Sequence, residues 1–237
     1  PREQAEANLS SAVERTVSAG GHVLLPVPAV GISQELILVL DRLTKGGRLQ
    51  TKVLVEKIIA EATAIYEAYP EFLSKELAKY VLESETGYFG SQFSIVESEN
   101  LNPSEPTVVL AQSSMLIGGP SVGYLKQIAN DPKSALIMLS YQSLESPGRA
   151  LLEGSRQITI GRETIKVECQ VERIDGLGSH SDYNQLMAYI MRLRPKLRRV
   201  LVNHGERPKA QNLASMINKQ FKIQTQHPLV QEAIKLL

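Results

Sequence analysis

The chain has 237 residues, enough for one large domain or two small ones, and its 43% hydrophobic and 22% charged residues form an ordinary globular balance. A formal net charge of +1 excludes a global field that draws the protein to nucleic acid, so any such attraction must be local. The single cysteine, Cys169, excludes a disulfide framework and a cysteine-built zinc site, and it fits a reducing cytoplasm. No apolar run approaches the roughly 20 residues of a membrane helix. No signal peptide is visible, and the start at Pro1 indicates a fragment or a processed product.

The first part of the chain predicts alternating helices and strands. An amphipathic pattern over residues 3–18 predicts a helix that ends at Gly20. The short apolar run over 22–28 predicts a buried strand, and apolar residues at helical spacing over 31–43 predict the next helix. This strand–turn–helix step is typical of parallel α/β sheets.

The middle of the chain continues this pattern after an irregular stretch. A helix is predicted over 56–73 with a break at Tyr69, and residues 84–106, rich in Ser, Glu, Gly and Asn, predict an irregular connection. The pattern then predicts, in order, a buried strand over 107–111, a polar glycine-rich turn, a helix over 121–128 and a buried strand over 134–139.

The last third changes character, so the composition shift near residue 155 is the best candidate domain boundary. Alternating apolar residues over 156–174 predict an antiparallel pair turned at Gly161. The remaining predicted elements are a loop over 175–182, a helix to Leu193, a strand over 199–203, a helix over 208–220 and a short terminal helix over 228–237.

Three polar clusters follow predicted strands or a loop, over 112–119, 178–182 and 204–206. In parallel α/β sheets, ligands gather at the carboxyl ends of the strands. His204 directly follows a predicted strand, and Gly205 would let the backbone turn sharply behind it. A neutral imidazole there suits a transition metal, with Glu206 orienting it from behind.

The second histidine candidate, His180, lies in a Gly/Ser loop that ends at Asp182, which we expect to be the N-cap of the next helix. Simpler interpretations stay open for both histidines, because a lone histidine is more often a hydrogen-bonded structural residue than a ligand. A turn such as residues 118–120 is more often a plain helix entry than a phosphate cradle. Five cations fall within residues 192–199, where a solvated helix end and loop is favoured over contact with phosphates.

Taken together, five segments resemble motifs of the β-CASP family of metallo-β-lactamase-fold RNA nucleases, in the family's order. The resemblance is closest to archaeal cleavage and polyadenylation specificity factor homologues. Residues 174–182 look like the histidine motif called B, and residues 202–206 look like motif C. The other three similar segments are residues 20–35, which resemble the opening of the β-CASP cassette, residues 113–120, and the pair formed by residues 140–142 and 147–149.

The resemblance implies an α/β fold, with a parallel-sheet β-CASP domain over residues 1–155 whose first strand is expected upstream. It also implies the C-terminal part of a metallo-β-lactamase αββα domain over residues 156–237. In the full-length protein two zinc ions would serve as cofactors, of which this chain supplies at most one ligand. The expected partners are RNA, the N-terminal lactamase half and, as in relatives, a second copy of the chain in a homodimer. No membrane association is expected.

The resemblance also assigns roles to individual residues. His204 would be the metal ligand, and His180 would act as general acid near the leaving oxygen, with Asp182 and Glu206 behind them. Ser113, Ser114 and Arg149 would lie along the RNA backbone. The implied activity is RNA phosphodiester hydrolysis in 3′-end processing or RNA turnover, endonucleolytic or 5′→3′ exonucleolytic.

The sequence departs from the family pattern in ways that favour a second interpretation, a non-catalytic RNA-binding or scaffold subunit. The family's first metal-binding motifs are absent from this chain, so the isolated chain is expected to be inactive. Ser114 stands where the family has a turn glycine, and it would be strained if that position needs a positive φ.

Overall fold

The computed structural model describes residues 2–84, 87–97, 100–178 and 180–235, and it divides into two compact units, residues 1–179 and 180–237. The first unit is built on a six-stranded sheet with the order β3-β2-β4-β1-β5-β8, in which every neighbouring pair is parallel. The predicted α/β class with a parallel sheet is therefore confirmed. Its strands are β1 (Val23–Val27), β2 (Lys52–Glu56), β3 (Phe93–Val96), β4 (Thr107–Gln112), β5 (Ala135–Met138) and β8 (Gln170–Arg173).

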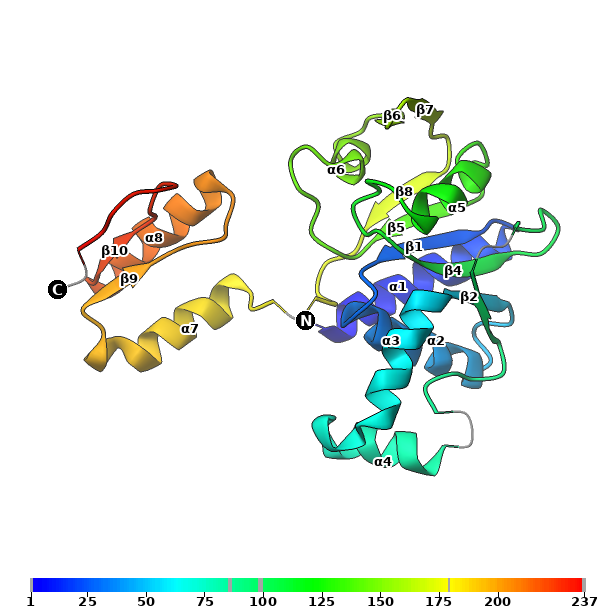
Figure 1. The fold of residues 1–237 in the computed structure, drawn as a ribbon, viewed down its shortest axis with the longest axis horizontal. Coiled ribbons are helices and arrows are strands. Elements are labelled where there is room, and N and C mark those ends of the chain that lie inside the picture. Colours follow the sequence, from blue (N-terminus) through cyan, green and yellow to red (C-terminus); the bar gives the residue numbers. More distant parts are fainter. Residues whose placement is uncertain (1, 85–86, 98–99, 179, 236–237) are drawn as a thin grey trace. The chain divides into compact units, whose positions relative to one another are not determined.

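Helices cover both faces of this sheet (Figure 1), which explains why its central strands are continuous apolar runs. All five residues of β1 are buried, and alternate side chains enter opposite cores. Val23 and Leu25 join the core on one face, and Leu24 joins the core on the other. The helices are α1 (Arg2–Ser18), α2 (Ile32–Lys45), α3 (Lys57–Ala68), α4 (Lys75–Glu83), α5 (Pro120–Ile128) and α6 (Pro147–Leu152), with a short 3₁₀ helix, η1 (Pro70–Phe72), before α4.

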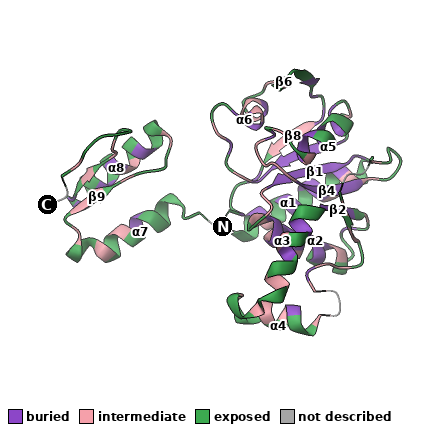
Figure 2. Ribbon diagram, viewed as in Figure 1, coloured by how far each residue is buried: buried purple, intermediate pink, exposed green. Residues whose placement is uncertain are grey.

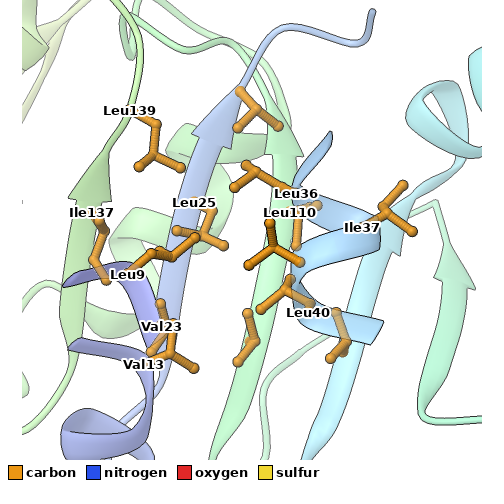
Figure 3. Packing of buried hydrophobic residues seen from close by; sticks show 14 of the residues in the cluster. Leu9, Val13, Val23, Leu25, Leu36, Ile37, Leu40, Leu110, Ile137 and Leu139 are labelled. Carbon is orange, nitrogen blue, oxygen red and sulfur yellow. The ribbon is translucent and has the colours of Figure 1, made fainter. Parts of the chain in front are cut away.

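The first core lies between the sheet and the helices α1 and α2 (Figure 3). Leu9 of α1 packs toward β1, and Leu36 and Leu40 of α2 pack against the centre of the sheet beside Leu110 of β4. Each of these side chains is fully buried. Burial of one such side chain contributes about 1.5–3 kcal/mol to folding. The opposite core holds α5, α6 and the hairpin of β6 (Gln157–Ile160) and β7 (Glu163–Lys166).

The second unit is smaller. It contains α7 (Tyr183–Leu193), the 3₁₀ helix η2 (Arg194–Lys196), β9 (Arg199–Leu201), α8 (Arg207–Phe221) and β10 (Gln224–Gln226). The strands β9 and β10 pair in parallel, and α7 packs on α8 through Met187 and Ile217. No helix in the described part of the chain is long and apolar enough to cross a membrane.

Several sequence-based predictions were wrong in detail. The stretch predicted to be irregular contains β3, whereas the predicted break of the 56–73 helix at Tyr69 is confirmed, since α3 ends at Ala68 and η1 follows. The antiparallel alternation predicted over 156–174 holds only for β6 and β7, because β8 leaves the hairpin and pairs in parallel with β5. The strand after residue 199 ends at Leu201, and the described residues 228–235 contain no helix.

The compact units divide at Ser179, later than the composition shift near residue 155, because β8 belongs to the sheet of the first unit. The assignment of residues 156–237 to a metallo-β-lactamase domain stays a prediction.

Candidate functional site

The first candidate site is the turn that joins β4 to α5 at the carboxyl edge of the sheet. Ser113 begins this turn with a left-handed backbone, φ 88°. Its carbonyl accepts hydrogen bonds from the Leu116 amide at 3.1 Å and from the Ser121 hydroxyl at 2.9 Å. The turn ends at Gly119, the N-cap of α5, with Pro120 in the first helical turn, so the helix-entry interpretation of residues 118–120 is confirmed.

Within this turn the non-glycine residues with a positive φ are Ser113 and Leu116, and not Ser114. A left-handed backbone costs a residue with a Cβ about 1–2 kcal/mol. Ser114 was expected to be strained only if its position needed a positive φ. The structure does not meet that condition, and the strain falls on Ser113 and Leu116 instead.

Gln142 ties this turn to the loop after β5. This buried residue, 1% exposed, donates from Nε2 to the carbonyls of Ser114 at 2.8 Å and Ser140 at 3.2 Å. The Gly148 amide donates to the Met115 carbonyl at 3.3 Å. A Cβ on Gly148 would lie 2.0 Å from Oε1 of Gln142, so a larger residue there would displace this side chain from the turn. The sequence analysis did not identify Gln142 as a site residue, although it lies in one of the family-like segments.

The three residues predicted to lie along RNA are at this same edge. Ser113 and Ser114 follow β4, and Arg149 is on α6, which begins at the Ser146 N-cap after β5. Both serines are half-buried, and their hydroxyls have no hydrogen-bond partner among the described residues. Arg149 is also half-buried and donates from Nε to Oε1 of Glu153 at 2.6 Å. Neighbouring strands β4 and β1 continue into helices on opposite sheet faces, which is where α/β sheets bind ligands.

The second candidate site surrounds His204 in the smaller unit. His204 lies between β9 and α8, its side chain is exposed, and its φ is 62°. Its amide donates to Oδ1 of Asn203 at 2.8 Å. The left-handed residue of this turn is the histidine itself, and Gly205 has no positive φ. A Cβ at Gly205 would make a tight contact of 3.2 Å with the Ala210 Cβ.

The predicted neighbours of the two histidines have clear structural roles. Asp182 is the N-cap of α7, as predicted, and its Oδ1 accepts from the Gln185 amide at 2.8 Å. His180 is exposed two residues earlier. Glu206, next to α8, accepts from Nζ of Lys209 at 3.0 Å. A role for Asp182 or Glu206 in orienting the histidines stays a prediction.

The remaining histidines are structural. His227 contacts the Val202 carbonyl through Nδ1 at 3.0 Å, which joins the end of the chain to the strand before His204. His22 is buried at the start of β1, and its amide donates to the Ser134 hydroxyl at 2.8 Å. Burial lowers the pKa of the His22 imidazole, and the nearby Asp131 carboxylate opposes that shift.

The described residues test how far this chain fits a zinc centre. No group of three or more His, Cys, Asp or Glu side chains in the described ranges is arranged to hold a metal ion. His204 offers an exposed imidazole with no side-chain hydrogen bond to the described residues, which fits one ligand of a zinc ion. The chain thus fits a part of such a centre, and a complete ligand set would need donors from elsewhere.

Two family models match parts of this chain. Residues 33–151 match the family model described as "Beta-Casp domain", which covers α2 to α6 and the turns at Ser113 and Arg149. Residues 164–228 match the model described as "Zn-dependent metallo-hydrolase RNA specificity domain", which covers both His180 and His204. Zinc and hydrolysis are therefore properties of the family that the second description names.

Curated archaeal relatives match almost the whole chain. Proteins named "Transcription termination factor FttA" are 42% identical in Cenarchaeum symbiosum, 39% in Thermococcus kodakarensis and 40% in Methanocaldococcus jannaschii. The alignments cover 99–100% of this chain but only 38–39% of each relative. The chain thus spans about two fifths of the length of these relatives. Since the first family model covers half of the chain, the chain belongs to the β-CASP family.

Proposed function

We propose that this chain is part of a zinc-dependent ribonuclease that hydrolyses RNA phosphodiester bonds during RNA 3′-end processing or turnover. The observation that carries the proposal is the exposed His204 imidazole on a left-handed turn after β9, inside the segment that matches a zinc-dependent metallo-hydrolase domain. A strained turn at a polar residue is a frequent feature of functional sites.

In this proposal His204 is one metal ligand, and the other ligands come from outside this chain. When bound, two zinc ions would supply an activated water and stabilise the charge on the phosphoryl oxygens. Hydrolysis breaks the bond between the phosphorus and the leaving oxygen, and that oxygen then needs a proton. His180, exposed before the Asp182 cap, would donate the proton that this oxygen takes. Glu206 and Asp182 would hold the segments of the two histidines.

The RNA backbone would pass the carboxyl edge of the parallel sheet. There the Ser113 and Ser114 hydroxyls have no partner in the described part of the chain and offer donors to phosphate oxygens. Gln142 fixes the Ser114 carbonyl, so the turn would meet RNA without first losing conformational entropy. The Arg149 guanidinium would bind a phosphate through its positive charge, and its ion pair with Glu153 would weaken when it does so.

The test uses the full-length protein that contains this chain, a single-stranded RNA labelled at one end, and added zinc. We expect cleavage that a chelator abolishes. His204→Ala should lose both cleavage and bound zinc. His180→Ala should keep its zinc and lower kcat by about 10²–10⁴, the usual contribution of a general acid. His227→Gln is the matched control, because that histidine contacts a backbone carbonyl, and it should cleave normally.

Chelator-resistant cleavage, or full zinc content in His204→Ala, would contradict the proposal. A second function is favoured by the name of the relatives, which refers to transcription termination and does not mention cleavage. In that case the chain would be a non-catalytic RNA-binding or scaffold subunit. Binding of the labelled RNA without zinc-dependent cleavage would support this second function.

A further inference from the structure

The net charge of +1 hides a strong segregation of charge between the two units. Residues 180–237 hold ten Lys and Arg but only three Asp and Glu, a net charge of +7. The first unit holds 16 basic and 22 acidic residues, a net charge of −6. Such an asymmetry points to a polyanionic partner of the basic part, because charged side chains on one unit set a local field that the whole-chain value cancels.

The basic residues are concentrated where α7 ends. Arg192, Arg194, Lys196 and Arg198, called here the basic segment, fall within seven consecutive residues and are all exposed. None of the four forms an ion pair with a described residue. Arg199, which follows, is different, since its guanidinium is held by Oε1 of Gln224.

Within the described part of this unit, no ion pair joins a carboxylate to the basic segment. Asp182 caps the opposite end of α7, about 15 Å away at 1.5 Å per residue. That distance exceeds the screening length of about 8 Å at physiological ionic strength. Glu206 is paired with Lys209, and Glu232 accepts from the Leu229 amide at 2.7 Å. The helix dipole accounts for Arg192 in the last turn, but Lys196 and Arg198 lie beyond the helix.

A second feature adjoins the basic segment on α7, whose surface is largely exposed (Figure 2). An open groove of about 500 Å³ is lined by Ser181, Gln185, Leu186, Ala188, Tyr189 and Arg192. Tyr189 is 60% exposed and lies one helical turn before Arg192. The groove therefore combines an aromatic ring, a cation and a polar amide on the side of α7 that does not carry the buried Met187.

We propose that the basic segment and the Tyr189 groove form a binding surface for single-stranded RNA, separate from the Ser113 turn. The cations would hold successive phosphates, and the Tyr189 ring would stack on one base. This pairing of stacking platform and positive charge suits a single strand of any sequence, because every base has a stacking face. The inference rests on the proposed function, because this surface would bind the RNA substrate at a distance from the residues that would cleave it.

The test measures RNA binding by fluorescence anisotropy with the whole chain, in chelator so that no metal contributes. A labelled single-stranded RNA of mixed sequence is titrated between about 50 and 200 mM KCl. We expect Arg194→Gln/Lys196→Gln to bind more weakly and to lower the slope of log K against log salt by about 1.4, or about 0.7 for each lost phosphate contact. The matched control, Lys75→Gln/Lys79→Gln on α4, removes the same charge and should leave the slope unchanged.

Tyr189 is tested in the same assay. Tyr189→Ala should weaken binding about tenfold with an unchanged salt slope, whereas Tyr189→Phe should retain binding, because stacking needs only the ring. Equal effects of the basic-segment pair and the α4 pair would overturn the proposal, and so would unchanged binding by both pairs. If the variant Arg194→Gln/Lys196→Gln binds RNA normally but loses binding to an acidic protein, the surface is a protein-binding site and the proposal is overturned.

This binding test and the cleavage test can fail separately. A slope change in a protein that never cleaves RNA would leave the binding surface in place and remove only the nuclease proposal. Zinc-dependent cleavage with an unchanged slope would do the reverse.

Discussion

The Glu56 carboxylate accepts a hydrogen bond from the Gln112 amide, with 2.9 Å between Oε2 and the nitrogen. Glu56 ends β2 and Gln112 ends β4, so the side chain continues the pairing of the two strands past their last backbone partners, Val55 and Leu110. Glu56 is buried, 8% exposed, and its partner Gln112 directly precedes the Ser113 turn. This contact explains why β2 ends in a carboxylate, and it supports the turn at the proposed RNA edge.

Loss of the Glu56 carboxylate should destabilise the sheet edge. Glu56→Ala leaves the Gln112 amide without its acceptor, and an unsatisfied buried donor costs about 1–3 kcal/mol. Glu56→Gln keeps an acceptor oxygen and should lose less. Urea unfolding of both variants measures the difference, with Glu61→Ala on the exposed side of α3 as control, expected within about 0.5 kcal/mol of wild type. Equal stability of Glu56→Ala and the control would contradict this role.

Gly21→Ala should be among the most destabilising single changes in the chain. A Cβ at this position would lie 2.2 Å from the Lys133 carbonyl oxygen, and backbone cannot move aside as a side chain end can. We expect a loss of at least about 2 kcal/mol in the free energy of unfolding. Gly123→Ala is the matched change, because it meets nothing within 4 Å and lies within α5. That variant should gain about 0.5–1 kcal/mol.

Alkaline pH should destabilise the first unit through Tyr88. Burial raises the pKa of this phenol from 10.0 to about 12, with the Glu35 carboxylate adding to the shift. Below the ordinary pKa of the phenol, Tyr88 is neutral in both the folded and the unfolded state, so its full contribution to the free energy of unfolding is present there. As the pH rises toward about 12, the unfolded state releases its proton first and stability falls. Tyr88→Phe should show a shallower decline of the unfolding free energy with pH, and an identical decline would contradict the assignment.

Two serine-to-glycine changes should act in opposite directions. Ser113→Gly removes the cost of a left-handed backbone at φ 88° and should raise stability by about 1 kcal/mol. Ser114 does not have a positive φ, so Ser114→Gly should lower stability, because glycine gains conformational freedom in the unfolded chain. Thermal unfolding decides the signs. If the Ser113 hydroxyl contacts RNA, Ser113→Gly should also bind RNA more weakly despite its higher stability, whereas unchanged affinity would remove Ser113 from the proposed edge.

The predictable part of the fold is the part whose side chains are buried on two faces. The strands β1, β4 and β5 were visible as short apolar runs because helices cover both sides of them. The edge strand β3 escaped prediction, since its residues are at most half-buried and it pairs on one side only. The strand β8 was mistaken for part of a hairpin because alternation identifies a strand but not its neighbour.

For the candidate site, the sequence located the segments but not their backbone conformations. His204 and Ser113 lie where the motifs predicted, yet each carries a left-handed φ that the sequence did not predict for it. Glycine marks where such a φ costs least and not where tertiary contacts impose it. Gln142 and Glu56 were missed as supports of the Ser113 turn because their partners are backbone groups far along the chain.

The strand order has a consequence for synthesis. The central strand β1 pairs with β4 and β5 and not with β2, so its neighbours begin 84 and 112 residues after Val23. A chain that emerges from the ribosome N-terminus first thus exposes two apolar strands, β1 and β2, before β4 arrives to lie between them. Long-range parallel pairing of this kind slows folding and leaves aggregation-prone strands open meanwhile.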